Sequence, residues 1–199
     1  MNNQHTTQTL NYYNQNAAQF SDSTQSLDFA SVQDKFLSFL QPQAHILDFG
    51  CGPGRDTKYF LSHGCSTDAI DGSEEFCRIA SEYAGIPVKQ MLFQEMNASE
   101  EYDGIWACSS ILHSTYDDLK DILKKLARAL KKEGILYASF KYGDFEGMRN
   151  GRYFIDMTED KLQRILQETD VFQIKEKWIS SDVRPGRDDE KWMNMILVK

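Results

Sequence analysis

The strongest constraint in this sequence is a glycine-rich turn that follows a short apolar run. Residues 44–49 read Ala-His-Ile-Leu-Asp-Phe, and glycines then occupy positions 50, 52 and 54. The apolar run predicts a buried strand, and the alternating glycines predict a sharp turn from that strand into a helix. Glycine accepts a positive φ and lets a ligand approach the backbone closely. The stretch therefore predicts a nucleotide-binding turn.

An acidic residue stands where a ribose-binding side chain is expected. Asp71 follows the first glycine of the turn by about twenty residues and closes the next predicted strand, at 66–70. A carboxylate at that point can accept hydrogen bonds from ribose hydroxyl groups. The turn and Asp71 together indicate a nucleotide ligand more strongly than either feature alone.

The hydrophobic pattern predicts strands and helices in alternation along most of the chain. Strands are expected at 45–49, 66–70, 88–93, 102–109, 135–140, 172–179 and 192–198. Helices are expected at 10–20, 28–40, 53–63, 73–83, 117–130 and 158–168, with frayed residues at 1–9 and loops at 141–152 and 180–190. This order predicts an α/β fold with a Rossmann-like, doubly wound, mostly parallel sheet. The ligand of such a sheet lies at the carboxyl ends of the strands.

Composition limits the compartment and the partners of the chain. Its 199 residues are 41% hydrophobic and 26% charged, with a formal net charge of −8. The negative balance makes nucleic-acid binding unfavourable over most of the surface, because such binding requires the neutralisation of phosphates. No apolar segment is long enough for a membrane span, and residues 1–8 lack the features of a signal peptide. We therefore expect a cytoplasmic protein with no membrane partner.

The length and the cysteine pattern predict one domain without a metal site. The four cysteines, at 51, 65, 77 and 108, show no C-x-x-C spacing and no nearby pair of histidines, so reduced thiols are expected. We expect a single domain over 1–199 that acts as a monomer or a weak homodimer. Within it, we expect a helical cover at 1–40, a cofactor-binding core at 44–142, and substrate-side loops with closing strands at 143–199.

The spacing of the turn distinguishes between nucleotide ligands. A dinucleotide-binding turn reads G-x-G-x-x-G, but here the third glycine comes one residue early and Arg55 takes its place. Asp48, two residues before Gly50, would repel a pyrophosphate and could orient an ammonium group. Both features favour a cationic nucleoside, which leaves an NAD-dependent oxidoreductase as the weaker alternative.

Over residues 10–142 the sequence resembles the class I S-adenosylmethionine-dependent methyltransferases. The matching segments are Leu47–Gly54 for the first motif, Ile70–Asp71 for the ribose-binding acid, Tyr102–His113 for the fourth-strand motif and Lys131–Leu136 for the turn into strand five. The resemblance implies a seven-stranded sheet whose antiparallel last strand is 192–198. It also implies S-adenosylmethionine as methyl donor and S-adenosylhomocysteine as product. The small size is similar to that of small-molecule and tellurite-resistance-type members.

The resemblance also implies roles for individual residues. Gly50 and Gly52 would lie against the methionine part of the cofactor, Asp48 near its ammonium group, and Asp71 at the ribose. Where the family has an acidic residue for adenine, this chain has Gln90–Glu95, so an apolar wall with the Leu92 backbone amide is expected instead. The further cofactor-binding residues implied are Tyr13, Gly54, Arg55, Gly72, Ser73, Met91, Leu92, Phe93 and Cys108.

The candidates for the chemistry and for the acceptor lie outside the glycine turn. His113, just past the fourth strand, is the best candidate general base because its ordinary pKa is near neutral; the alternative is that it only packs or hydrogen-bonds there. Arginine forks recognise anions, although pairing with nearby acids is an equally open fate for them. The acceptor-binding candidates are Tyr142, Arg149, Arg152, Arg184 and Arg187, with Tyr13 and Tyr153 as further pocket-lining residues.

These observations predict methyl transfer from S-adenosylmethionine to a small acceptor, which is an anion if the arginines bind it. One alternative is a methyltransferase of tRNA or another nucleic acid, which the arginines favour and the net charge opposes. A second alternative, of a different class, is a noncatalytic protein that binds the cofactor or a protein partner with the same fold.

Overall fold

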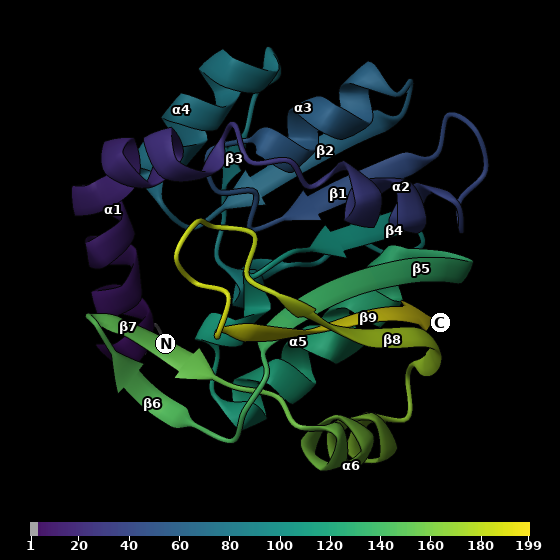
Figure 1. Ribbon diagram of the computed structural model, residues 1–199. Coiled ribbons are helices and arrows are strands. Elements are labelled where there is room, and N and C mark those ends of the chain that lie inside the picture. Colours follow the sequence, from purple (N-terminus) through teal and green to yellow (C-terminus); the bar gives the residue numbers. More distant parts are fainter. Residues whose placement is uncertain (1–3) are drawn as a thin grey trace.

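In the computed structural model, which describes residues 4–199, a seven-stranded sheet carries helices on both faces (Figure 1). The sheet strands are β1 (His45–Phe49), β2 (Ser66–Asp71), β3 (Lys89–Gln90), β4 (Tyr102–Ala107), β5 (Leu130–Lys141), β8 (Gln173–Ser181) and β9 (Lys191–Val198). The helices are α1 (Gln4–Thr24), α2 (Ala30–Leu37), α3 (Arg55–Ser62), α4 (Glu74–Ala84), α5 (Tyr116–Ala129) and α6 (Glu159–Thr169). Short 3₁₀ helices occupy η1 (Phe93–Glu95) and η2 (Ile111–His113), and a hairpin consists of β6 (Glu146–Arg149) and β7 (Arg152–Ile155).

The strand order confirms the predicted fold class. The order across the sheet is β3-β2-β1-β4-β5-β9-β8, and β9 is antiparallel to both of its neighbours. The other neighbouring pairs are parallel. The chain proceeds outward from β1 in one direction and from β4 in the other, so the carboxyl ends of β1 and β4 flank the point where a ligand of such a sheet binds.

Side chains along the central strands point alternately to the two faces of the sheet, so the apolar core has one part on each face. Leu47 and Phe49 of β1 pack in the cluster that contains the apolar faces of α5 and α6. Ile46 faces the other way and packs with Phe36 of α2 and Phe60 of α3. Successive side chains of a strand point to opposite faces, so a strand that is apolar throughout is buried on both.

Two elements differ from the sequence prediction because tertiary contacts outweigh local pattern. The strand expected at 88–93 pairs only at β3, and Phe93 turns away to stack on Phe49 with 4.6 Å between ring centroids. The residues expected to be frayed at 1–9 are helical from Gln4 onward, while residues 1–3 lie outside the described part.

The segment expected as a loop at 141–152 contains β6 and the turn of the β6–β7 hairpin, and β7 continues to Ile155. Its turn residues, Asn150 and Gly151, have φ values of 50° and 78°. Asn-Gly is the preferred pair for a two-residue turn in which both central residues need positive φ. The Asn-Gly dipeptide therefore predicts a hairpin turn here, although hydrophobic periodicity alone does not.

The described chain contains no candidate membrane-spanning helix: none of the helices in residues 4–199 is both long and apolar enough. The predicted cytoplasmic location and the predicted division at 1–40, 44–142 and 143–199 stay predictions.

We expect Gly54→Ala to destabilise the protein more than Gly64→Ala. Both glycines have positive φ, 87° and 81°, so both substitutions carry a backbone cost of about 1–2 kcal/mol. A Cβ at Gly54 would also lie 3.0 Å from the Cβ of Ala80 on α4, whereas a Cβ at Gly64 meets no atom within 4 Å. Urea unfolding of the two variants measures the difference. Equal losses of unfolding free energy would contradict the close packing of the turn against α4.

Candidate functional site

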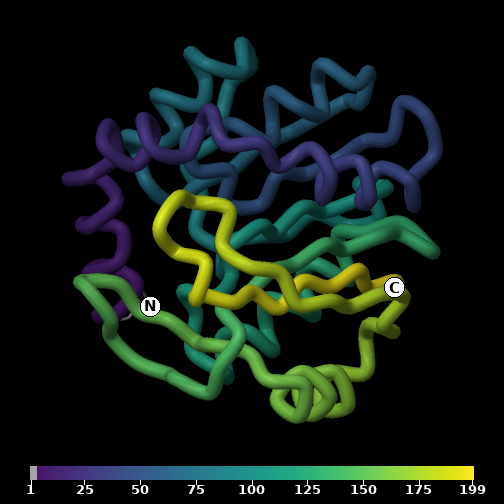
Figure 2. Tube along the Cα trace, in the orientation of Figure 1, coloured from purple at the N-terminus to yellow at the C-terminus, as the bar shows by residue number. Residues whose placement is uncertain are grey.

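A pocket of about 240 Å³ lies at the carboxyl ends of the central strands. Its floor comes from the glycine turn after β1, the end of β2, the segments that follow β3 and β4, and the end of β5. Its walls come from α1, the β6–β7 hairpin and the loop between β8 and β9. Figure 2 shows these three segments in purple, green and yellow at the same end of the sheet. The pocket is where the parallel sheet predicted a ligand to bind.

The first two glycines of the turn serve different purposes. Gly50, Gly52 and Gly54 all have positive φ, as the turn requires. A Cβ at Gly50 would come within 2.5 Å of the Ser110 Cβ, so close packing alone excludes a side chain there. A Cβ at Gly52 would meet no atom within 4 Å, and Gly52 lines the pocket. The turn therefore leaves open space beside Gly52 in which a ligand can contact the backbone.

Asp71 is held at the edge of this space by the backbone. One carboxylate oxygen accepts the N–H of Gly52 at 2.9 Å, and the other accepts the N–H of Ser73 at 2.8 Å. Burial raises the pKa of Asp71 to about 6, although these backbone hydrogen bonds oppose the rise. Each carboxylate oxygen can accept more than one hydrogen bond. Asp71 and the adjacent Gly72 line the pocket, so the arrangement fits a ligand that brings hydroxyl groups.

Asp48 does not reach the pocket, in contrast to the position implied for it near an ammonium group. Its side chain is 2% exposed and accepts a hydrogen bond from the Thr57 hydroxyl at 2.6 Å, beneath the turn. Burial, followed by the charge of Asp56, raises the pKa of Asp48 well above its ordinary value. In this position it ties β1 to α3.

Two further predicted cofactor residues also lie outside the pocket wall. Ser73 caps α4 by accepting the N–H of Phe76 at 3.2 Å, and its hydroxyl donates to the Asn14 side chain at 2.6 Å. Gly54 packs against Ala80 of α4. Their roles in the structure are to begin α4 and to let α3 and α4 pack closely.

Arg55 lines the pocket but is already paired. Its Nε and Nη2 atoms donate to the two oxygens of Asp56 at 2.7 and 2.9 Å, and its guanidinium lies 4.5 Å from the centre of the Phe29 ring. Burial alone would lower the pKa of Arg55, but Asp56 raises it. Asp56 also accepts hydrogen bonds from Gln33 and Trp106, at 2.7 and 2.8 Å. This network makes Arg55 a rigid, neutralised part of the wall.

The residues predicted to wall an adenine line the pocket, but one predicted contact differs. Met91, Leu92 and Phe93 line the pocket together with Gln94. The Leu92 amide that was expected to face adenine donates instead to the Glu95 carboxylate at 2.8 Å. Cys108 also lines the pocket, and burial raises its pKa to about 12, which keeps the thiol protonated.

Tyr13 and His113 form a hydrogen-bonded pair across the pocket. The Nδ1 atom of His113 lies 2.6 Å from the carbonyl oxygen of Tyr153, so this nitrogen carries the proton and donates. Nε2 of the neutral ring then accepts the Tyr13 hydroxyl at 2.8 Å. Burial lowers the pKa of His113 to about 4, and the charge of Arg152 also lowers it. The ring is therefore a neutral acceptor for Tyr13 rather than a free base.

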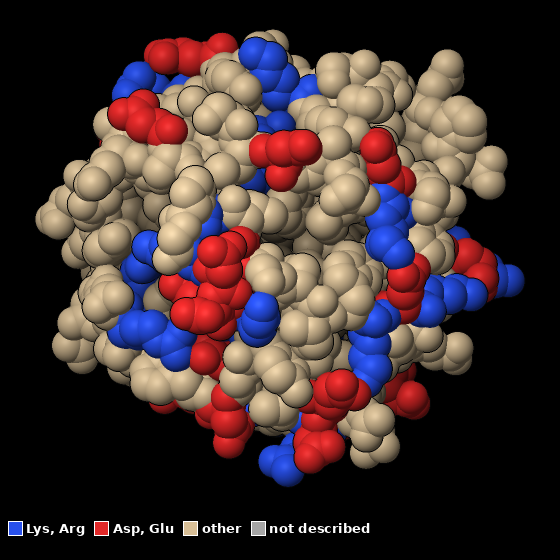
Figure 3. Space-filling model, in the orientation of Figure 1, with Lys and Arg blue, Asp and Glu red and all other residues tan. Residues whose placement is uncertain are grey.

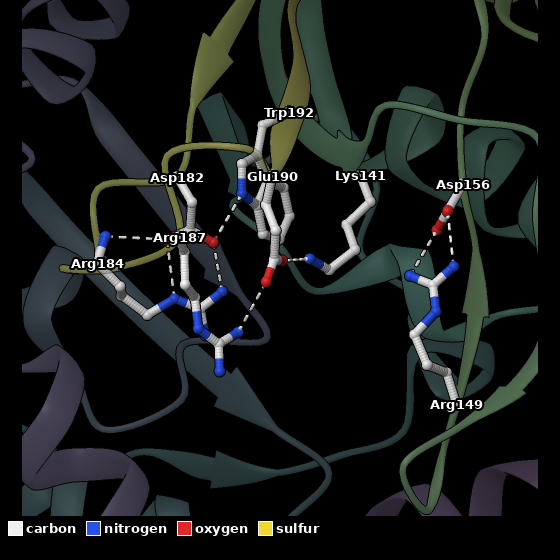
Figure 4. Close-up of polar contacts among 8 residues, drawn as sticks. All are labelled: Lys141, Arg149, Asp156, Asp182, Arg184, Arg187, Glu190 and Trp192. Atoms are coloured by element: carbon white, nitrogen blue, oxygen red, sulfur yellow. Dashed lines mark hydrogen bonds and ion pairs between the residues drawn. The ribbon is translucent and has the colours of Figure 1, made fainter.

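The predicted acceptor-binding residues separate into two groups. Arg152, Arg184 and Arg187 line the pocket, whereas Tyr142 and Arg149 do not. Tyr142 is 44% exposed, and the Arg149 guanidinium donates to Asp156 at 2.8 Å, away from the cluster on the loop between β8 and β9 (Figure 4). The structure does not bring these two residues to the pocket.

Within the pocket, the loop between β8 and β9 pairs its own charges. Arg184 binds the Asp182 carboxylate, with Nε donating to Oδ1 at 2.8 Å, and Arg187 donates to Glu190 at 3.4 Å (Figure 4). Glu190 also binds Lys141 at the end of β5. Both loop arginines are thus paired with nearby acids, Arg184 with Asp182 and Arg187 with Glu190.

Several residues that line the pocket were not predicted from the sequence. Thr9 and Leu10 on α1 line the pocket, but they lie in or beside the segment expected to fray. Ser139 of β5 and Asn194 of β9 also line it, although each is 2% exposed. Polar residues inside otherwise apolar strands are uncommon in a core, and that signal could have identified both.

The surface around the pocket does not resemble a nucleic-acid-binding face. In Figure 3, basic and acidic side chains are interspersed over the face shown, and acidic side chains cluster near its centre. This distribution gives the nucleic-acid alternative no support.

Comparison with known proteins identifies a methyltransferase domain. Residues 46–134 match the family model described as "Methyltransferase domain". A malonyl-[acyl-carrier protein] O-methyltransferase from Enterobacter lignolyticus is 29% identical over 99 residues, which cover 47% of this chain and 37% of that protein. The match therefore spans little more than a third of the relative's length.

Solved structures share the fold. The 1,6-didemethyltoxoflavin-N1-methyltransferase of Burkholderia thailandensis, solved with its substrate and S-adenosylhomocysteine, has a TM-score of 0.75 at 20% identity, covering 96% of this chain and 84% of that one. An S-adenosylmethionine-dependent methyltransferase from Methanosarcina mazei has a TM-score of 0.73 at 19% identity, covering 87% and 99%. At these identities the likeness shows the fold alone.

We expect His113 to make stability fall as the pH falls from about 6.5 to about 4. Its pKa is about 4 in the folded protein against an ordinary 6.5, so the unfolded chain binds the proton more readily in this window. The loss attributable to His113 is at most about 3 kcal/mol. Urea unfolding of wild type and His113→Gln across this pH range measures it as a difference.

The contribution of His113 is obtained as the difference in unfolding free energy between wild type and His113→Gln, because the titration of Asp71 changes the stability of both proteins in the opposite direction. Its pKa is raised to about 6, so its protonation stabilises the folded state as the pH falls. Parallel pH profiles for wild type and His113→Gln would show that His113 is not held neutral.

Proposed function

We propose that the chain is a class I S-adenosylmethionine-dependent methyltransferase that transfers the methyl group of this cofactor to a small acceptor, because residues 46–134 match a methyltransferase-domain model. The observation that carries the proposal is the open space at Gly52, which the buried carboxylate of Asp71 borders at the carboxyl ends of β1 and β2. When bound, the cofactor supplies an electrophilic methyl group on a sulfonium. The protein then has to hold donor and acceptor in line and exclude water.

The pocket offers a separate surface to each part of the cofactor. We assign the backbone at Gly52 to the methionine part and the carboxylate of Asp71 to the ribose hydroxyls. The side chains of Met91, Leu92 and Phe93 are assigned to the adenine, because an apolar wall suits a flat base whose polar edge faces elsewhere.

Enclosure and charge support a small anionic acceptor. α1, the β6–β7 hairpin and the loop between β8 and β9 wall the pocket on the side away from the sheet. A nucleic-acid acceptor would need a wider opening and a basic surface around the pocket. A small molecule needs neither. Arg152 supplies the positive charge, since the two loop arginines that line the pocket are paired with acids.

We expect calorimetry to show binding of S-adenosylmethionine and S-adenosylhomocysteine and no binding of NAD. Asp71→Asn should weaken both sulfur nucleosides by about 10- to 100-fold, because a charged hydrogen-bond acceptor is lost. Asp68→Asn is the matched control: Asp68 lies on the same strand and pairs with His45, outside the pocket.

The outcomes separate the alternatives. Binding of NAD without either sulfur nucleoside would contradict the proposal. Tight binding of S-adenosylmethionine without methyl transfer to any of a broad panel of acceptors would favour a noncatalytic binding protein instead. Equal weakening by Asp68→Asn and Asp71→Asn would remove the assignment of the ribose to Asp71.

A further inference from the structure

Arg152 is the one pocket-lining cation without a carboxylate partner among residues 4–199. The other cationic residues of the wall are each paired with an acid: Arg55 with Asp56, Arg184 with Asp182, and both Lys141 and Arg187 with Glu190. Arg152 has no such ion pair. Arg152 is therefore the guanidinium of the wall that no carboxylate of the described chain contacts, whereas Lys141 and Arg187 share the one carboxylate of Glu190.

The surroundings of Arg152 fix its orientation and leave part of its hydrogen-bonding capacity unused. Its guanidinium carbon lies 4.5 Å from the ring centre of Tyr12 and 5.1 Å from that of Phe154. Nη1 donates to the Tyr13 hydroxyl at 3.4 Å, while the buried Nε has no hydrogen-bond partner in the described chain. A buried N–H donor without an oxygen or nitrogen acceptor is costly. An anion that arrives with the substrate would satisfy it.

A carboxylate suits this site better than a phosphate. The edge of a guanidinium presents two N–H donors that match the two oxygens of a carboxylate. One unpaired cation balances one negative charge, whereas a phosphate monoester carries nearly two at neutral pH. Each remaining cation of the wall already has an acid partner, since Arg184 pairs with Asp182 and both Lys141 and Arg187 pair with Glu190.

The pocket also lacks a group suited to take a proton from the acceptor. Nε2 of His113 accepts the Tyr13 hydroxyl, and the pKa of this histidine is about 4. Burial would raise the pKa of Asp182, but its hydrogen bonds from Arg184 lower it to about 2, so it too is a weak base. Asp71 accepts the N–H groups of Gly52 and Ser73 on the side assigned to the cofactor. A nucleophile that arrives already deprotonated would need none of these groups.

We propose that the acceptor is a small monocarboxylic acid whose carboxylate binds Arg152 and is itself methylated, so that the product is a methyl ester. One carboxylate oxygen forms a bond to the methyl carbon, and the carbon–sulfur bond breaks with its electron pair left on sulfur. The carboxylate and the sulfonium lose their charges together, and no proton is released. In contrast, methylation of a protonated amine or a hydroxyl group releases one proton per turnover.

This inference rests on the proposed methyltransferase function. Its first part, the binding of a carboxylate to Arg152, can be tested without turnover. In the presence of S-adenosylhomocysteine, butyrate, benzoate and phenylacetate are titrated against their amides by NMR. The carboxylates should bind more tightly than the amides, and Arg152→Gln should weaken them by about 10- to 100-fold. Arg152→Lys, which keeps the charge without the planar fork, should give an intermediate loss and serves if the glutamine variant is unstable. Arg164→Gln, an exposed arginine on α6, is the control.

Two binding results would overturn the assignment. One is equal affinity of wild type for carboxylates and amides. The other is a loss of S-adenosylhomocysteine affinity in Arg152→Gln as large as the loss of carboxylate affinity, since Arg152 would then bind the carboxylate of the cofactor itself.

Product analysis tests the second part of the inference, the methylation of the bound carboxylate. With donor carrying a ¹³C-labelled methyl group, we expect a methyl ester from at least one of the three acids, detected by NMR and mass spectrometry, with no proton release in weakly buffered solution. Label on another atom of the acceptor, release of one proton per turnover, or carboxylate binding without ester formation would each overturn the proposal. Failure to bind S-adenosylmethionine at all would instead refute the proposed function, so the two failures are distinguishable.

Discussion

The site depends on the attachment of the glycine turn to the end of β2. The N–H groups of Gly50 and Cys51 donate to the Ile70 carbonyl oxygen at 2.9 and 3.0 Å, and the N–H of Gly52 donates to Asp71 at 2.9 Å. These bonds require a backbone with positive φ at Gly50 and Gly52, which a larger residue adopts only with strain. They also place the Asp71 carboxylate beside the open space at Gly52. Fold and cofactor site thus share one set of hydrogen bonds.

The acceptor side is assembled from segments far apart in the sequence. α1 contacts the hairpin, where the Thr9 hydroxyl accepts the N–H of Tyr153 at 3.0 Å. Gly151 lets the Tyr12 ring pack on the hairpin turn, because a Cβ there would lie 3.1 Å from it. These contacts carry Arg152 and Tyr13 to the same wall. We infer that the sheet determines where the cofactor binds, whereas α1 and the hairpin determine which acceptor enters.

The sequence predicted the parts of the molecule that depend on local pattern. The apolar run, the glycines and the acid that closes the next strand are encoded within about thirty residues, and the strand–helix alternation then implies the topology. Asn150–Gly151 carried a local hairpin signal as well. Local sequence pattern was therefore sufficient to predict the sheet and the glycine turn.

Other features depend on which side chains meet after folding. Pattern alone cannot indicate that Asp182 and Glu190 neutralise the loop arginines while Arg152 stays unpaired. The burial of Asp48 beneath the turn and the coupling of His113 to Tyr13 are likewise results of tertiary packing. Each of these three features changes what the residue can do chemically, which is why individual site residues were less predictable than the sheet and the glycine turn.

The central claim is that one pocket holds the cofactor on Asp71 and a separate carboxylate on Arg152. A crystal structure with S-adenosylhomocysteine and benzoate tests it most directly. The account predicts ribose hydroxyls within about 3 Å of the Asp71 carboxylate and the benzoate oxygens at a similar distance from the Arg152 guanidinium. A structure in which the homocysteine carboxylate occupies Arg152, or in which the ribose lies away from Asp71, would contradict it.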